Sequence, residues 1–128
     1  YACRAGTTTV YSWGDDINSS HANYSASGVG ETEEVGQYAA NPWGFFDMHG
    51  NVWEWTADAF RIKSLSRSAK ARNRTARANN QKVLKGGSFL CHASYCYRYR
   101  IAARSGVEAC SSASNVGFRV AYDWVQRP

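Results

Sequence analysis

Two cysteines five residues apart, in the segment 85–100, constrain the fold of this chain more than any other feature. The segment reads KGGSFLCHASYCYRYR, so Cys91 and Cys96 follow a Gly-Gly pair and stand among aromatic and basic residues. On a strand, residues at this spacing point to opposite faces, and on a helix they are separated around the axis. If the two thiols meet, the chain between them must leave regular secondary structure.

The spacing leaves three interpretations of the pair open. Cys91 and Cys96 are two independent buried thiols, a structural disulfide, or a metal or redox site. Buried cysteine is a common small core residue, which favours the first two interpretations. Two thiolates without a second pair cannot complete a four-cysteine zinc site, but they can hold Cu(I), a soft ion that accepts two ligands. His92 is a weaker candidate for a third ligand, because it directly follows Cys91.

Charge is distributed unevenly along the 128 residues, which are enough for one domain at most. Residues 1–58 carry 8 acidic residues and 1 basic residue, whereas residues 59–107 carry 12 basic residues and no acidic one. The densest basic run lies within about 59–82 and is predicted to be a solvated, variable loop. Basic runs also collect phosphates, but no known nucleic-acid-binding module is present, so an anionic protein is the other partner class considered and nucleic acid is not expected.

No apolar run approaches the length that spans a bilayer, and no signal peptide is visible. We therefore expect no membrane association and a cytoplasmic location, with a secretory route as the alternative. The chain begins in the middle of a sequence pattern at Tyr1. We expect a chain of this kind to be a fragment, a processed product or one half of a split enzyme.

The distribution of turn-forming residues predicts an α+β fold with little regular secondary structure. Val83–Lys85 is predicted to be a short strand before the Gly-Gly turn, and the alternation of aromatic and basic residues over 97–102 predicts another. Residues 117–122 are predicted to form a final strand. Residues 14–43, rich in Ser, Asn, Gly and Glu, are predicted to be loop. Long irregular segments need something to hold them, and bound ions would do so.

Three blocks and an opening motif stand out along the chain: NPWGFFDMHGNVWEW (41–55), the cysteine block (83–104), SSASNVGFRV (111–120), and YACRAG (1–6) followed by YSWG (11–14). In this order they resemble the C-terminal half of the formylglycine-generating enzymes, the sulfatase-modifying factor family. The resemblance covers nearly the whole chain except about residues 59–82. It implies a C-type-lectin-like fold, of which residues 1–128 are the C-terminal part of the catalytic domain, and hence a partial domain.

The resemblance carries an expected activity. GNVWEW and GFRV mark the wider superfamily, including non-enzymatic members, whereas the paired cysteines with Tyr-Arg-Tyr-Arg point to the formylglycine branch. It implies copper-dependent, O₂-using oxidation of a cysteine in a Cys-x-Pro-x-Arg motif of a target sulfatase to Cα-formylglycine. Implied partners are a sulfatase or other protein with that motif, and an N-terminal half of the domain as a separate chain. A non-catalytic C-type-lectin-like binding module is the alternative, and it would not need the cysteine pair.

The same resemblance assigns site residues. The two cysteines would hold Cu(I) and be joined by the substrate thiol, polar neighbours would place O₂, water or substrate backbone, and aromatic and basic neighbours would wall or shape the pocket. Plain packing is the competing explanation for Trp53, and an ion pair with Asp58 is the competing explanation for Arg104. The expected catalytic residues are Cys91, Cys96, Ser88, Asn115, Trp53, Tyr95 and Arg104.

Two calcium sites are also implied by the family. Oxygen ligands from a flexible loop suit Ca²⁺. The first site uses side chains of Asp47 and Glu54 with the carbonyls of Gly50 and Val52. The second uses Asn23, the carbonyl of Tyr24 and a downstream acid, although the loop 25–28 contains no acid where the family has one.

Cys3 and Cys110 are predicted to be free thiols, the default in a reducing cytosol. In some relatives the cysteine that matches Cys3 pairs with a cysteine at the position of Ile101, so that bridge is absent here. A bridge between Cys3 and Cys110 is the remaining alternative.

Overall fold

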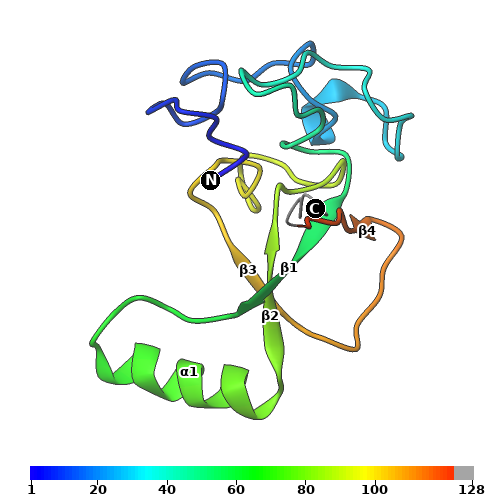
Figure 1. The fold of residues 1–128 in the computed structure, drawn as a ribbon. Coiled ribbons are helices and arrows are strands. Elements are labelled where there is room, and N and C mark those ends of the chain that lie inside the picture. The colour runs from blue at the N-terminus through cyan, green and yellow to red at the C-terminus, as the bar shows by residue number, and fades with distance from the viewer. Residues whose placement is uncertain (123–128) are drawn as a thin grey trace, which may run out of the picture.

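A computed structural model describes residues 1–122 and consists of a curled four-stranded sheet, one α-helix and long loops (Figure 1). The strand order is β3-β2-β1-β4. β1 pairs antiparallel with β2, β2 pairs antiparallel with β3, and β4 lies parallel to the start of β1. The α+β fold with little regular structure is therefore confirmed. The strands are β1 (Trp53–Ala59), β2 (Gln81–Lys85), β3 (Ser105–Glu108) and β4 (Val116–Gly117).

The predicted loop over 14–43 is confirmed, since its only helical element is the 3-10 turn η1 (Ser25–Ser27). The N-terminal loops gather at one end of the sheet (Figure 1). Side-chain amides satisfy the backbone groups there, because irregular chain lacks ladder partners. Asn41 Nδ2 donates to the carbonyl of Ala2 at 2.7 Å, and its Oδ1 accepts from the N–H groups of Trp43 and Phe45, both at 3.0 Å.

The segment at Gly50 and Asn51 joins three loops through backbone hydrogen bonds. The N–H of Gly50 donates to the carbonyl of Gly86 at 2.8 Å, and the N–H of Asn51 donates to the carbonyl of Asn23 at 2.7 Å. The carbonyl of Asn51 accepts from the N–H of Phe89 at 2.9 Å. The N-terminal loops, the start of β1 and the turn after β2 are thereby fixed to one another.

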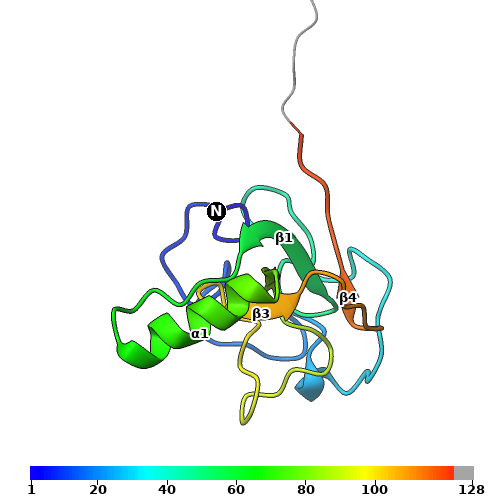
Figure 2. The same ribbon diagram turned by 90° about the horizontal axis from the view of Figure 1, so that it is seen from below.

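The prediction of a loop over the basic run at 59–82 is wrong, because half of it forms helix α1 (Arg67–Ala78). The side chain of Ser66 caps the helix by accepting from the N–H of Ala69 at 3.2 Å. Alanine, arginine and lysine are good helix formers, which offsets the charge. Only Ala69 and Ala76 are buried, so α1 lies lightly against the sheet (Figures 1 and 2). Within residues 1–122, no helix is long and apolar enough to cross a bilayer.

The strand predictions have mixed outcomes. Residues 83–85 do lie in β2. The strand over 97–102 is wrong: Tyr97 has a positive φ of 39°, and the Arg100 guanidinium stacks over the Tyr97 ring at 4.1 Å, so the chain turns there. Of the strand predicted over 117–122, only Gly117 lies in a strand. β4 is an edge strand that ends at Gly117, and within the described chain residues 118–122 pair with no other strand.

His49 is buried at the base of the N-terminal loops and connects several of them. Its Nδ1–H donates to the carbonyl of Tyr99 at 2.6 Å, so Nε2 is the acceptor. Nε2 lies 3.4 Å from the N–H of Ser12 and 3.5 Å from the Cys3 Sγ. The Tyr11 and Trp13 rings pack edge-on against the imidazole. The neutral imidazole is therefore the form that this environment accommodates.

We expect substitution of Gly87 by alanine to destabilise the fold far more than substitution of its neighbour Gly86. Both have positive φ, 74° and 89°, which costs an alanine about 1–2 kcal/mol. A Cβ on Gly87 would also stand 2.8 Å from the Tyr99 Cβ, whereas one on Gly86 would make ordinary contacts with the carbonyl oxygens of Met48 at 3.5 Å and Val52 at 3.8 Å. Urea unfolding of both variants measures the difference, and equal losses would contradict the packing argument.

The stability of the fold should also depend on pH through His49. Burial lowers the pKa of His49 below its ordinary value of 6.5. The unfolded chain therefore takes up the proton first, and the free energy of unfolding should decrease as pH falls below 6.5. Urea unfolding at about pH 7.5 and about pH 5 measures the loss. The variant His49→Gln should lose less over the same interval, and an identical loss in both proteins would exclude His49 as the cause.

Candidate functional site

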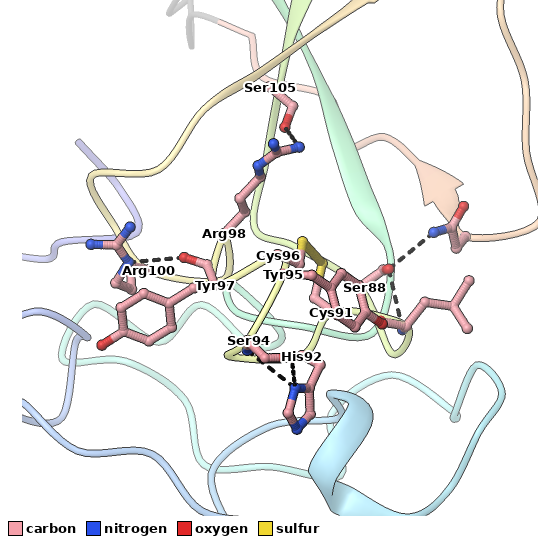
Figure 3. Close-up of a disulfide and its surroundings, with 12 residues drawn as sticks. Ser88, Cys91, His92, Ser94, Tyr95, Cys96, Tyr97, Arg98, Arg100 and Ser105 are labelled. Atoms are coloured by element: carbon pink, nitrogen blue, oxygen red, sulfur yellow. Dashed lines mark hydrogen bonds between the residues drawn. A yellow bond between two sulfur atoms is a disulfide. The ribbon is translucent and has the colours of Figure 1, made fainter.

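The cysteine loop, residues 88–97, brings the two predicted thiols together. It follows the Gly-Gly turn at the end of β2 and is closed by its own backbone. The N–H of Cys91 donates to the carbonyl of Ser88 at 2.9 Å, and the carbonyl of His92 accepts from the N–H groups of Cys96 at 2.8 Å and Tyr97 at 3.0 Å. The Cα atoms of Cys91 and Cys96 are 5.1 Å apart, and their sulfurs form a disulfide (Figure 3). Independent thiols are thus excluded.

Asn115 and Trp53 come from two distant segments and meet this loop near its first residue, Ser88, and at Cys91. The Ser88 side chain is wholly buried, and its Oγ accepts from Asn115 Nδ2 at 3.0 Å and from the Leu90 N–H at 3.3 Å. The Asn115 carbonyl accepts from the N–H of Trp53 at 2.8 Å, next to the pairing of β1 with β4. Trp53 is 8% exposed and belongs to the same packed core cluster as Cys91.

Tyr95 and Arg104 lie further out than these three residues. Tyr95 is 70% exposed; its hydroxyl donates to the Leu90 carbonyl, and its ring stacks on His92 with centroids 5.9 Å apart. Arg104 is exposed and donates from Nη2 to the carbonyl of Arg61 at 3.1 Å. The ion pair expected as an alternative role for Arg104, with Asp58, is not formed. Within residues 1–122 the ion pair joins Arg119 to Glu54 instead.

An open cavity of about 610 Å³, here termed the α1 cavity, adjoins Trp53 between the sheet and α1. Arg104 forms part of its wall together with two arginines that the sequence analysis left without a role, Arg72 of α1 and Arg98 of the segment after the cysteines. Arg98 donates from Nη1 to Ser105 Oγ at 3.2 Å (Figure 3). Arg98 belongs to the alternating aromatic and basic residues over 97–102. The strand predicted there gave no indication that Arg98 lines the same cavity as α1.

Cys3 and Cys110 are free, as predicted. Cys110 is exposed, whereas the Cys3 thiol lies half-buried beside His49 and donates to the carbonyl of Met48 at 3.6 Å. Burial raises the pKa of the Cys3 thiol, although the nearby ammonium of Lys85 opposes this shift. A protonated thiol is a poor nucleophile, so Cys3 is expected to react slowly.

The two carboxylates of the first predicted calcium site, Asp47 and Glu54, already have protein partners. The Glu54 carboxylate forms an ion pair with Arg119, which also donates to the carbonyls of Phe46 and Asp47 at 3.1 and 3.2 Å. The Glu54 carboxylate raises the pKa of Arg119 further. The Asp47 Oδ2 accepts from the N–H of Gly36 at 2.7 Å. A permanently charged guanidinium therefore stands beside Glu54, where the family resemblance places an ion.

The second predicted calcium site has its polar groups fully engaged. Asn23 is wholly buried; its Nδ2 donates to the carbonyl of Glu31 at 2.8 Å and its Oδ1 accepts from Ser27 Oγ at 3.0 Å. The Tyr24 carbonyl accepts from the Ser27 N–H at 2.9 Å and from the Ser27 Oγ at 2.7 Å. Across residues 1–122, no three His, Cys, Asp or Glu side chains cluster as metal ligands. Calcium at Asn23 and Tyr24 stays a prediction.

Comparison with known proteins finds one family over nearly the whole chain. The family described as sulfatase-modifying factor enzyme 1-like domain matches residues 1–124. The chain is 38% identical to the formylglycine-generating enzyme of Mus musculus, over 96% of this chain and 37% of that protein. It is also 38% identical to the formylglycine-generating enzyme of Mycobacterium tuberculosis, over 96% and 48%. The chain thus spans less than half the length of these relatives.

A relative whose name describes it as an inactive enzyme matches the chain as well. The chain is 29% identical to a Bos taurus protein named inactive C-alpha-formylglycine-generating enzyme 2, over 94% of this chain and 40% of that protein. Among solved structures, Treponema denticola variable protein 1 superposes with a TM-score of 0.63 at 26% identity, covering 92% of this chain and 42% of that one. CarF superposes with a TM-score of 0.58 at 24% identity, covering 85% and 35%, a likeness of fold alone.

We expect thiol labelling to separate the four cysteines into three classes. Without reductant, Cys110 should be alkylated quickly because it is exposed, and Cys3 slowly because burial shields its thiol and raises its pKa. Cys91 and Cys96 should be labelled only after reduction. Mass spectrometry of the alkylated chain counts the labels, and Cys110→Ser identifies the fast site. Labelling of Cys91 or Cys96 in the unreduced protein would contradict the disulfide.

Proposed function

Because this chain belongs to the sulfatase-modifying factor family, we propose that it supplies the thiol loop for oxidation of a protein cysteine to Cα-formylglycine. The target is a cysteine in a Cys-x-Pro-x-Arg motif of a sulfatase or another protein. The observation that carries this proposal is the convergence of Cys91 and Cys96 on one loop, braced by Ser88 and Asn115. Relatives named as formylglycine-generating enzymes support the same reaction class.

The thiol pair acts in its reduced form. Cys91 is enclosed in the core, whereas Cys96 is only half-buried, so the pair is reached from the side of Cys96. When reduced, the two thiols can reach one soft ion, because their Cα atoms are 5.1 Å apart. These residues fit Cu(I), which when bound would supply one-electron chemistry with O₂. A reductant must therefore open the disulfide before the substrate thiol can join the site.

Ser88, Asn115 and Trp53 position the loop. Asn115 Nδ2 holds the Ser88 Oγ, and Ser88 in turn holds the backbone that leads into Cys91. Trp53 packs with the core around Cys91 and keeps water from that side of the pair. Fixed geometry of this kind lowers the cost of aligning a substrate thiol with the pair. Tyr95, being exposed, is placed to contact a bound peptide.

The redox balance of the reaction requires an external reductant. Replacement of the substrate C–S bond by C=O, with sulfur leaving as sulfide, removes two electrons from the substrate. Reduction of O₂ to water accepts four electrons, so two more must come from a thiol in solution. The same reductant would keep Cys91 and Cys96 open.

The test is aerobic incubation of the copper-loaded chain and dithiothreitol with a Cys-x-Pro-x-Arg peptide, followed by mass spectrometry. Conversion of cysteine to the aldehyde should be lost in Cys91→Ser and Cys96→Ser, because each variant removes one thiolate of the pair. Cys110→Ser is the matched control and should retain conversion, since Cys110 is exposed and unpaired with this loop. Conversion by Cys91→Ser would overturn the assignment. No conversion by the folded, copper-loaded wild type would favour the non-catalytic binding module.

Calcium at Asp47, Gly50, Val52 and Glu54 remains part of this proposal. Binding there requires the Glu54 carboxylate to be shared between Ca²⁺ and Arg119, because the two are already paired. Calorimetric titration of Ca²⁺ into the wild type and Glu54→Gln tests the site, and identical heats in both proteins would exclude it.

A further inference from the structure

We propose that the α1 cavity binds an acidic segment of polypeptide. On the proposed function, the site would thereby select protein substrates whose target cysteine is flanked by Asp or Glu. The cavity lies between the sheet and helix α1, and the arginines that line it are additional to the thiol loop.

The α1 cavity combines an apolar floor with a cationic wall. Trp53 and Phe60 contribute to the floor, and the Phe60 ring lies directly over Gly106, where an added Cβ would stand 2.4 Å from it. The guanidinium-bearing side chains come from three segments: Arg72 from α1, Arg98 from the chain after Cys96, and Arg104 from the approach to β3. A volume of about 610 Å³ is that of cavities that enclose a small ligand or a few side chains.

The three arginines have no carboxylate partner within residues 1–122. Arg98 and Arg104 donate only to neutral groups, the Ser105 hydroxyl and the Arg61 carbonyl, and the recorded ion pair joins Arg119 to Glu54 instead. No acidic residue occurs between 59 and 107. Arginine stays charged at any physiological pH and binds carboxylates in a bidentate manner. The wall is thus complementary to Asp or Glu side chains.

A peptide suits the α1 cavity better than a nucleic acid. Proteins that bind single strands display aromatic rings as stacking platforms for bases. Here Trp53 is 8% exposed and the half-buried Phe60 ring packs against Gly106, so neither ring is fully exposed. The apolar floor instead accommodates an aliphatic side chain between flanking carboxylates.

The position of the cavity connects it with the thiol loop. Arg98 is two residues after Cys96, and Trp53 lies in the core cluster that contains Cys91. Figure 3 shows Arg98 extending from the disulfide toward Ser105, that is, toward the sheet and the cavity. Residues that flank a cysteine held at the loop would therefore pass over the cationic wall.

The first experiment measures binding without any chemistry. The probe is a fluorescein-labelled peptide of Asp, Glu and Leu residues that contains no cysteine, titrated with the disulfide-bonded chain and followed by fluorescence anisotropy. Arg72→Gln should weaken binding about fivefold through loss of a charge-assisted contact. Arg67→Gln, on the same helix but outside the cavity, should bind as the wild type does, and added salt should weaken all affinities. Circular dichroism confirms that α1 is intact in both variants.

Two results of that titration would overturn the proposal. One is equal affinity of Arg72→Gln and the wild type for the acidic peptide. The other is stronger binding of a single-stranded oligonucleotide of the same net charge, which would make nucleic acid the partner.

The second experiment measures substrate selection. Two Cys-x-Pro-x-Arg peptides, one with Glu and one with Gln flanking the motif, are compared under the oxidation conditions described above. The wild type should convert the acidic peptide several-fold faster, and Arg72→Gln should lose most of this preference. Equal rates for both peptides would exclude selection while leaving the oxidase intact. No conversion of either peptide would exclude the oxidase, and the binding titration would still decide whether the cavity takes acidic peptides.

Discussion

The backbone of Gly50 and Asn51 is the constraint on which the rest of this structure depends. Two adjacent residues with positive φ, 77° and 57°, turn the chain so that their polar groups face three other loops. The resulting hydrogen bonds reach Asn23, Gly86 and Phe89. A Cβ at Gly50 would stand 2.2 Å from the Asn23 carbonyl oxygen, so the approach is possible only for glycine. Long loops can be ordered in this way because their backbone groups are satisfied at one point.

The candidate site is built on the loops that this junction holds, with the sheet as a support. β2 delivers the cysteine loop, β1 delivers Trp53 and β4 delivers Asn115. The chemistry-bearing atoms lie where the strands end, since regular structure cannot bring residues at the spacing of Cys91 and Cys96 together. Helix α1 lies in the connection between β1 and β2, at the end of the sheet opposite the N-terminal loops (Figure 1). Reactive groups and recognition groups thus come from different parts of the chain.

The sequence was sufficient to predict the loop-rich α+β fold. The family resemblance implied that Ser88, Asn115 and Trp53 lie near the cysteines, and the structure has them there. The sequence was insufficient where a local pattern competed with tertiary contacts. The alternation at 97–102 resembles a strand, but the tight loop around His92 and the stacking of Arg100 on Tyr97 turn the chain. Ser66 as an N-cap and the alanines at 67–78 favour a helix, but the prediction gave more weight to the high positive charge of this segment and placed a loop there. The α1 cavity needs three-dimensional proximity and has no sequence signature.

The short pairing of β4 with β1 has a consequence for how the molecule folds and opens. It consists of Trp53 opposite Val116 and Glu54 opposite Gly117, reinforced by an Arg119–Glu54 contact between residues 65 apart in sequence. Closing so long a loop costs entropy before any contact forms, so this pairing follows the more local β1–β2 hairpin in folding. It is also the pairing with the fewest bonds to break. Partial opening at this edge would withdraw Asn115 from Ser88 while the disulfide kept the cysteine loop closed, so a folded chain could exist with its site disassembled.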